Sequence, residues 1–298
     1  MSRVMPAQRT SSYTIYRSLE CRPDSYQGWY QQGNALRDGG RYEEALDNYD
    51  RALEYKPDDY WAWYWRGDIL ETLGRFKEAL ESYDKALLSK PTDYWAWCQR
   101  GSVLRQLEQY EEAIASYDKA LETRPDDYWA WYNRGRVALE DLDWFKDAIA
   151  SFEKALEARP DDYWSWYRRG DALRHWGHLE EALTSYDKAL AAKPTDYWSW
   201  YQRGEVLRQL GRYQEAISSY DKALELEPED DYAWYNQACC YALVGNTELA
   251  IAALQQAIYL NANEYPQLAK TDSDFDNLRE NDKFQALLKG DLPFGKRA

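Results

Sequence analysis

Seven prolines recur along the chain at an almost constant spacing, and this spacing constrains the fold more than any other feature. Successive members lie 34 residues apart, with one interval of 35; they are Pro23, Pro57, Pro91, Pro125, Pro160, Pro194 and Pro228. The segment around five of them is nearly the same, from KPDDYWAWYWRG to KPTDYWSWYQRG. Such a period predicts an array of supersecondary units, each of which buries its apolar face only against its neighbours.

Each unit is expected to be a helical hairpin. In YEEALDNYDRALEYKP the apolar residues follow the i, i+3, i+4, i+7 spacing of an amphipathic helix. A further helix is predicted over residues 60–73. Each proline ends the second helix of a unit, and the following Asp offers an N-cap to the next helix. A glycine that suits a left-handed C-cap follows the first helix at Gly40, Gly74, Gly177 and Gly211. No segment alternates over strand length, so the fold class is all-α.

The unit resembles the tetratricopeptide repeat (TPR). With Tyr26 counted as position 1, the pattern is Trp at 4, Gly at 8, Ala at 20, an aromatic residue at 24, Ala at 27 and Pro at 32. The second repeat supplies all of these as Trp63, Gly67, Ala79, Tyr83, Ala86 and Pro91. The resemblance implies a right-handed α-solenoid of about seven hairpins, over residues 26–59, 60–93, 94–127, 128–162, 163–196, 197–230 and a degenerate 231–264. We expect Gly at position 8 to allow close helix approach, so that a larger residue there, as in Gly101→Leu, would lower the melting temperature.

The two ends of the array are expected to differ from the repeats. Residues 1–25 form a partly disordered N-terminal cap with at most one short helix, around Tyr13–Leu19. Residues 265–298 resemble the terminal segment of bacterial TPR proteins, in which a final capping helix covers the last hairpin. Its buried face would be Phe275, Leu278, Phe284, Leu287 and Leu288, and the tail DLPFGKRA would fray.

The fourth repeat contains one extra residue. An insertion near Val137–Ala138, inside the first helix, would form a π-bulge and rotate the following side chains. The alternative is a longer turn elsewhere in the repeat.

Composition excludes several functions. The balance of 37 Lys+Arg against 52 Asp+Glu gives a net charge of −15, which disfavours nucleic-acid binding. No apolar run is long enough to span a membrane. The four cysteines form no CxxC pair and indicate reduced thiols in a cytoplasmic protein. The histidines, His175 and His178, flank Gly177 at a predicted helix end, so no metal site is expected. No catalytic or cofactor-binding motif occurs, and we expect neither enzymatic activity nor a cofactor.

The candidate site is an aromatic stripe on the first helices. Position 2, which the repeat does not require to be aromatic, is Trp in five repeats. Positions 2, 5, 9 and 12 share one helix face, which in proteins that this chain resembles lines a concave groove for a partner peptide. The predicted peptide-binding residues are Trp61, Tyr64, Trp95, Arg105, Trp129, Tyr132, Arg136, Trp164, Tyr167, Arg174, Trp198, Tyr201 and Arg208.

These residues predict a groove that suits a peptide with apolar and acidic side chains, because Trp, Tyr and Arg dominate binding hot spots. The alternative is that the tryptophans only pack along the solenoid. Glycan or small-ligand binding and self-association are further possibilities. The carboxylate clamp that holds chaperone C-terminal tails in some TPR proteins needs Lys at position 5, which here is Tyr or Cys98, so we do not expect such tails as partners.

A second repeated pattern predicts an ion pair. Arg stands at position 7 in five repeats, as in Arg66 and Arg100, and an acid stands at position 25, as in Asp84 and Asp118. We expect each Arg to pair with the acid of its own hairpin, with about 0–1 kcal/mol of stabilisation if the pair is exposed.

Overall fold

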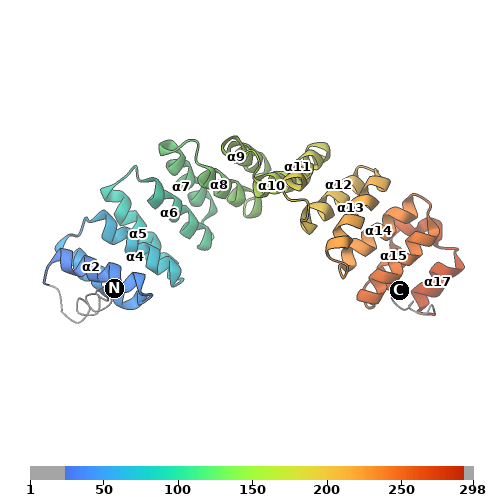
Figure 1. Ribbon diagram of the computed structural model, residues 1–298, viewed down its shortest axis with the longest axis horizontal. Helices are drawn as coiled ribbons and strands as arrows, with labels where there is room; N and C mark the ends of the chain where they lie inside the picture. Colours follow the sequence, from blue (N-terminus) through green and yellow to red (C-terminus); the bar gives the residue numbers. More distant parts are fainter. Residues whose placement is uncertain (1–23, 292–298) are drawn as a thin grey trace, which may run out of the picture. The chain divides into compact units, whose positions relative to one another are not determined.

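A computed structural model describes residues 24–291 of the chain, and these residues form helices and connecting turns with no β-strand. Within them the chain divides between Asp143 and Trp144 into two compact units (Figure 1). The first unit contains α2 (Tyr26–Asp38), α3 (Tyr42–Tyr55), α4 (Tyr60–Thr72), α5 (Phe76–Ser89), α6 (Tyr94–Gln106), α7 (Tyr110–Thr123) and α8 (Tyr128–Glu140). Successive helices in this unit pack as antiparallel neighbours, as the all-α prediction requires.

The second unit continues the series and ends in shorter elements. Its long helices are α9 (Phe145–Ala158), α10 (Tyr163–His175), α11 (Leu179–Ala192), α12 (Tyr197–Gln209), α13 (Tyr213–Leu226), α14 (Asp231–Leu243) and α15 (Thr247–Leu260). They are followed by α16 (Tyr265–Thr271), the 3-10 helix η1 (Ser273–Leu278) and α17 (Asp282–Lys289). None of the helices within residues 24–291 combines the length and the apolar character needed to cross a membrane.

Local sequence signals place the helix ends. From the second repeat on, the Asp before each first helix is its N-cap: the side chain of Asp59, for example, accepts a hydrogen bond of 2.9 Å from the backbone N–H of Ala62. In the first repeat Ser25 caps α2 in the same way. The turn after the first helix needs one residue with positive φ, which is glycine at Gly74 (φ 73°). Glu108 and Asp143 adopt the same left-handed conformation (φ 60° and 55°) without being glycine.

In the first six repeats the core of the hairpin forms around the glycine at position 8 and the aromatic ring at position 24. A Cβ atom added to Gly101 would lie 3.0 Å from Cζ of Tyr117, which is almost completely buried. The alanines at positions 20 and 27, such as Ala113 and Ala120, have no exposed surface. The Trp at position 4 also serves the fold, because the indole N–H of Trp97 donates to the carbonyl oxygen of Pro91 (2.8 Å). These contacts explain the small residues of the repeat pattern sterically.

The extra residue of the fourth repeat lies in a turn. Helix α8 has 13 residues, the same number as α4 and α6, and it contains no π-helical turn. The segment from Asp141 to Trp144 follows it, whereas only Leu73, Gly74 and Arg75 separate α4 from α5. The π-bulge interpretation is therefore wrong, and the longer turn is confirmed. The division between the two units falls in this turn.

The arginines at position 7 do form ion pairs, but with different partners from those predicted. Arg100 on α6 donates from Nε to Asp84 on α5 (2.7 Å), so it pairs with the preceding repeat and not with Asp118 of its own hairpin. Its Nη1 donates to the buried Ser116 on α7 (2.7 Å). The same shift occurs at Arg66–Asp50, Arg134–Asp118, Arg169–Glu153 and Arg203–Asp187. Arg100 thus joins three successive helices, and its role is to hold neighbouring repeats together.

Replacing Arg100 by methionine is expected to lower the free energy of unfolding by about 1–2 kcal/mol, because it removes a charged hydrogen bond between repeats while keeping the apolar stem. The urea midpoint measures this change. Arg51→Met is the control, since the Arg51–Glu54 pair lies within one helix and is largely exposed. Arg51→Met should change the free energy of unfolding by no more than about 0.5 kcal/mol. Equal effects of the two substitutions would contradict the inter-repeat role.

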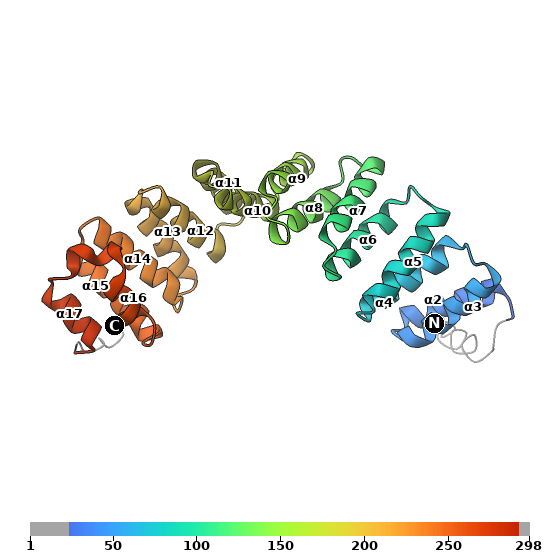
Figure 2. The same ribbon diagram turned by 180° about the vertical axis from the view of Figure 1, so that it is seen from behind.

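The C-terminal segment covers the last hairpin with three short elements, not with a single helix. Helices α16 and α17 lie at the end of the second unit, beside α15 (Figure 2). Phe275, Leu278, Phe284 and Leu287 are buried as predicted, and Leu288 is partly buried against the same cluster. The predicted helix around Tyr13–Leu19, and all of the tail DLPFGKRA except Asp291, lie outside the described residues.

Candidate functional site

The aromatic residues at position 2 are exposed, although they are large and occur in every repeat from the second to the seventh. Each lies in the first turn of a first helix, one residue after a buried or half-buried position. The exposed fractions are 46% for Trp61, 52% for Trp95, 55% for Trp129, 51% for Trp164, 56% for Trp198 and 55% for Tyr232. We call these six residues the aromatic ladder. It has three members in each unit, and about half of each side chain is accessible to solvent.

The tyrosines at position 5 do not flank the ladder as accessible residues, contrary to the sequence prediction. Tyr64, Tyr132 and Tyr167 are each only 9% exposed. The ring of Tyr64 stacks on Tyr60 (centroids 5.8 Å apart) and meets Tyr83 edge-on (5.8 Å). Tyr201 is partly buried and makes equivalent contacts. The reason for the difference is that position 5 points toward the ring at position 24, and it therefore belongs to the hairpin core.

The predicted arginine band is neutralised by neighbouring acids. Arg105 lies 2.5 Å from Glu140 and 2.6 Å from Asp141, and Arg136 lies 3.2 Å from Glu140. In the second unit Arg208 lies 3.3 Å from Asp274 and 3.7 Å from Glu205. These pairs are partly buried, so the arginines are held within the protein and offer little free charge to an acidic ligand.

The remaining predicted arginine, Arg174, lies beside a histidine. Its Nη2 lies 3.0 Å from Nε2 of His175. The ring of His175 stacks on Phe145, whereas that of His178 stacks on Trp176 and contacts Glu181 through Nδ1 (2.9 Å). The two histidines thus have separate partners.

Several carboxyl groups on the first helices are buried or half-buried. Burial raises the pKa of Asp68, Glu71 and Asp171 above the ordinary range. Tyr83 donates a hydrogen bond to Glu71 (3.1 Å), and Tyr186 donates one to Asp171 (2.8 Å). Glu71 and Asp171 thus have partners inside the protein, which indicates a structural role.

Cations lie beside two of the ladder rings, Trp61 and Trp95, a feature that the sequence analysis missed. The ammonium of Lys90 is 4.1 Å from the ring centre of Tyr60 and 4.8 Å from that of Trp61. Arg124 occupies the corresponding place, 4.5 Å from Tyr94 and 5.4 Å from Trp95. The signal was the Lys or Arg that precedes most of the repeated prolines. Each contact covers part of a ring by a cation–π interaction and leaves the remainder open.

A cavity of about 280 Å³ opens between two ladder tryptophans in the first unit. Its lining combines aromatic rings with neutral polar groups: Tyr94, Trp95, Cys98, Gln99, Ser102, Tyr117, Trp129 and Asn133. Cys98 is the only residue at position 5 that is not tyrosine. Burial raises the pKa of its thiol to about 11, so the thiol is neutral at physiological pH. This cavity is lined by two members of the ladder, Trp95 and Trp129.

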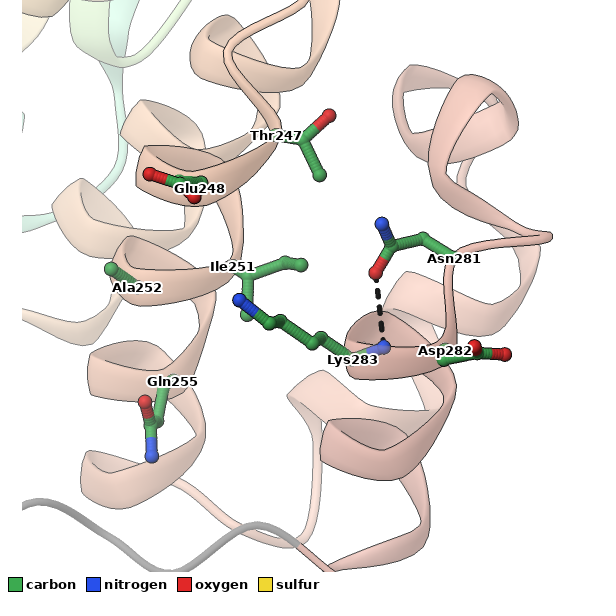
Figure 3. Close-up of a pocket in the computed structure, with 8 residues that line it drawn as sticks. All are labelled: Thr247, Glu248, Ile251, Ala252, Gln255, Asn281, Asp282 and Lys283. Carbon is green, nitrogen blue, oxygen red and sulfur yellow. Dashed lines mark hydrogen bonds between the residues drawn. The ribbon is translucent and has the colours of Figure 1, made fainter.

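A larger hollow of about 940 Å³ lies in the second unit, away from the ladder. Figure 3 shows it between α15 and α17, with the side chain of Lys283 pointing from α17 toward Ile251. Asn281 caps α17 by accepting a hydrogen bond of 3.0 Å from the backbone N–H of Lys283. None of the sequence-predicted site residues lines this hollow, and it results from the way in which the C-terminal segment covers α15.

One group of possible metal ligands occurs within residues 24–291, formed by Cys239, Asp272 and Asp274. Tyr235 donates to Asp272 (2.7 Å), Asp272 caps η1, and Arg208 contacts Asp274. Because these carboxylates already accept hydrogen bonds from the protein and lie beside a cation, the group stabilises the C-terminal segment.

Comparison with known protein families gives matches along most of the described chain. Three models of the tetratricopeptide repeat match this chain. The first matches residues 30–94 and 142–197, the second residues 197–230, and the third residues 82–115 and 219–252. A fourth model, described as a TPR repeat, matches residues 101–140. A search of curated proteins finds no match.

Solved structures of TPR proteins are similar to this chain. YrrB, described as a TPR protein with an unusual peptide-binding site, is 29% identical with a TM-score of 0.57; the match covers 64% of this chain and 98% of YrrB. The C-terminal part of a TPR repeat-containing protein from Cytophaga hutchinsonii is 18% identical with a TM-score of 0.70, covering 82% and 99%. MamA residues 41 to the end from Desulfovibrio magneticus RS-1 are 24% identical with a TM-score of 0.54, covering 58% and 97%. The last two likenesses concern the fold alone.

Proposed function

The chain belongs to the tetratricopeptide repeat family, and we propose that it is a non-enzymatic scaffold that binds a partner polypeptide on its aromatic ladder. The fold of this family supports protein–protein interaction in general. The exposure of the ladder is the observation that carries the finer proposal, since 46% to 56% of each of six large side chains faces solvent. Large exposed aromatic side chains, which both units carry, commonly mark interaction sites.

The chemistry of the ladder favours polypeptide over glycan. Sugars stack on open ring faces, but Lys90 and Arg124 lie over parts of the Trp61 and Trp95 rings. A polypeptide uses ring edges, small gaps and backbone polar groups together, as aromatic hot spots do. YrrB, the similar structure with the higher sequence identity, is described as having a peptide-binding site, which supports the same class of ligand.

The neutralised arginines change the expected ligand. Arg105 and Arg208 are already paired with acids, so acidic side chains of a partner would have to displace Glu140, Asp141 or Asp274. We therefore propose that apolar and aromatic side chains supply the main contacts, and that a cytoplasmic location, which suits the unpaired thiols of Cys98, Cys239 and Cys240, accompanies this role.

The test is retention of partners by three forms of the full chain. The ladder variant carries Trp95→Ala, Trp129→Ala and Trp164→Ala. The control variant carries Tyr55→Ala, Leu88→Ala and Tyr259→Ala, which removes three large exposed side chains (54%, 76% and 56%) from second helices. Circular dichroism first establishes that all three forms are folded. Proteins from a host lysate that the wild type and the control retain, and the ladder variant does not, identify the partner.

For a partner found in this way, affinity is then measured by titration calorimetry. The ladder variant is expected to bind at least about 30-fold more weakly, because hot-spot tryptophans contribute roughly 2 kcal/mol or more. Equal affinity of the ladder variant and the wild type would reject the ladder as the binding surface. A mass that rises with concentration in the wild type and not in the ladder variant would show that a second copy of the chain is the partner.

A further inference from the structure

The third repeat is the one repeat without tyrosine at position 5, and the cavity between Trp95 and Trp129 lies beside this position. Position 5 is Tyr30, Tyr64, Tyr132, Tyr167, Tyr201 and Tyr235 in the other repeats. Here it is Cys98, and a cavity of about 280 Å³ opens beside it. Replacing a phenol ring by a thiol removes most of a side chain that packs against several neighbours, and that volume is left open on the surface.

We propose that this cavity binds the tyrosine side chain of a partner polypeptide, which restores the ring that the third repeat lacks. This inference rests on the proposed function only in assuming that the bound ring belongs to a polypeptide. A volume near 280 Å³ is at the lower limit of small-ligand pockets, roughly 300 Å³, and suits one ring better than a larger group.

The sixth repeat shows how a phenol sits in these surroundings. The ring of Tyr201 stacks on Tyr197, with centroids 6.0 Å apart and an interplanar angle of 24°. It meets Trp198 edge-on at 6.4 Å and Tyr220 edge-on at 6.0 Å. Its hydroxyl oxygen accepts a hydrogen bond of 3.0 Å from the side-chain amide of Asn236. These are favourable aromatic geometries with a satisfied hydroxyl group.

The cavity in the third repeat offers the same set of groups. Tyr94, Trp95, Gln99, Tyr117 and Asn133 correspond in position to Tyr197, Trp198, Gln202, Tyr220 and Asn236. An inserted phenol would therefore stack on Tyr94, meet Trp95 and Tyr117 edge-on, and accept a hydrogen bond from Asn133.

Asn133 has a donor for that bond. Its Nδ2 already donates to the carbonyl oxygen of Trp129 (2.8 Å), and the amide carries two hydrogens. Trp95 and Trp129, which are 52% and 55% exposed, stand at the mouth and would contact the flanking residues of the partner.

The lining selects a neutral ring. None of the eight lining residues is an acid or a base. A phosphorylated tyrosine would bring about two negative charges into a cavity with an uncharged lining, and the nearby Arg124 already lies over the rings of Tyr94 and Trp95, so unmodified tyrosine is the expected ligand. Phenylalanine fits the ring contacts but leaves the amide of Asn133 without its acceptor, and it should bind more weakly.

The first experiment uses p-cresol, which is the tyrosine side chain alone, titrated against the full-length protein at millimolar concentrations and followed by NMR. One equivalent is expected to bind, with nuclear Overhauser effects to the indole protons of Trp95 and Trp129. Toluene should bind roughly two- to tenfold more weakly, because it lacks the hydroxyl group. Absence of these effects, or equal binding of toluene, would overturn the proposal without reference to any variant.

Two variants then locate the site. Cys98→Tyr fills the cavity with the residue that the other repeats use, so the variant is expected to fold and to lose saturable p-cresol binding. Tyr201→Cys is the matched gain-of-site variant, since it creates the same opening in the sixth repeat, and it should bind two equivalents. Unchanged binding by Cys98→Tyr, or one equivalent in Tyr201→Cys, would place the ligand elsewhere and contradict the assignment.

A last comparison separates this inference from the proposed function. The capped peptide Gly-Tyr-Gly should displace p-cresol, and Gly-Phe-Gly should do so at several times higher concentration. If p-cresol binds and the Tyr peptide does not, the cavity takes free phenols and the polypeptide assignment fails. A failure of p-cresol itself rejects the cavity, while retention of partners by the ladder is measured independently with the tryptophan variant.

Discussion

Gly101→Leu is expected to lower the melting temperature by roughly 5 °C or more. A Cβ atom on this residue would lie 3.0 Å from Cζ and 3.1 Å from both Cε atoms of Tyr117, and leucine adds three further carbons. Overpacking of this kind costs about 1–3 kcal/mol, occasionally more, and three added carbons against a buried ring place it at the upper end. The better helix propensity of leucine returns only about 1 kcal/mol. Thermal unfolding followed by circular dichroism measures the net loss; an unchanged melting curve would show that the helices do not need to approach so closely.

The seventh repeat suggests a control that restores the packing. It carries Ala238 at position 8 and Leu254 at position 24, and both are fully buried. The larger residue at position 8 thus occurs together with a smaller one at position 24. Combining Gly101→Ala with Tyr117→Leu should therefore cost less than the sum of the two single changes, with a coupling of about 0.5–3 kcal/mol. Simple additivity would indicate that the two positions do not contact each other.

The contact between Gly101 and Tyr117 shows why much of the fold could be predicted. The spacing of the prolines, the helical periodicity of apolar residues and the small residues at positions 8, 20 and 27 are all local signals, and each predicts the same helical hairpin. The helix ends followed from the Asp caps and the prolines for the same reason. The turn that contains the extra residue could not be placed, because an alignment of letters does not show whether a helix or its turn absorbs an insertion.

Contacts between repeats were harder to derive. Position 25 carries an acid in several successive repeats, so the sequence alone cannot tell whether Arg100 reaches Asp118 or Asp84. Which acid is chosen depends on how one hairpin stacks on the next, and that is a tertiary property. The tyrosines at position 5 were misassigned for a related reason: a helix face predicted to be exposed is partly covered by the ring at position 24, as at Tyr64 and Tyr83.

Only part of the candidate site could be predicted from the repeat pattern. The ladder could be predicted because five repeats have tryptophan at position 2, where the repeat does not require an aromatic residue. The cavity at Cys98 was visible only as an exception to a pattern, and its volume depends on the neighbouring rings of Tyr117 and Trp129. One short side chain, Cys98, thus gives the third repeat a cavity at the position where the other repeats have tyrosine. The tyrosine at position 5 of the other six repeats indicates that a tyrosine side chain is the ligand that fits it.

The C-terminal segment provides the other large expected effect, because terminal units of a solenoid must cover an otherwise exposed hairpin face. Phe275 has no exposed surface and meets Tyr235 edge-on at 5.8 Å, with Phe284 at 5.6 Å. Phe275→Ala is expected to cost about 3–5 kcal/mol, the usual range for removing a buried ring. It would uncover the cluster that contains Cys239 and Leu254.

The loss of stability in Phe275→Ala should be confined to the helices that share this cluster, since each solenoid repeat contacts only its neighbours. Hydrogen exchange of the full chain should therefore become faster in α14, α15, α16 and α17, while α4 to α7 keep their wild-type rates. Leu268→Ala in α16 is the control, because that side chain is 42% exposed and its removal should change stability by no more than about 0.5 kcal/mol. If α14 and α15 stay fully protected in Phe275→Ala, the last hairpin is stable without its cover, and the capping role of the segment is refuted.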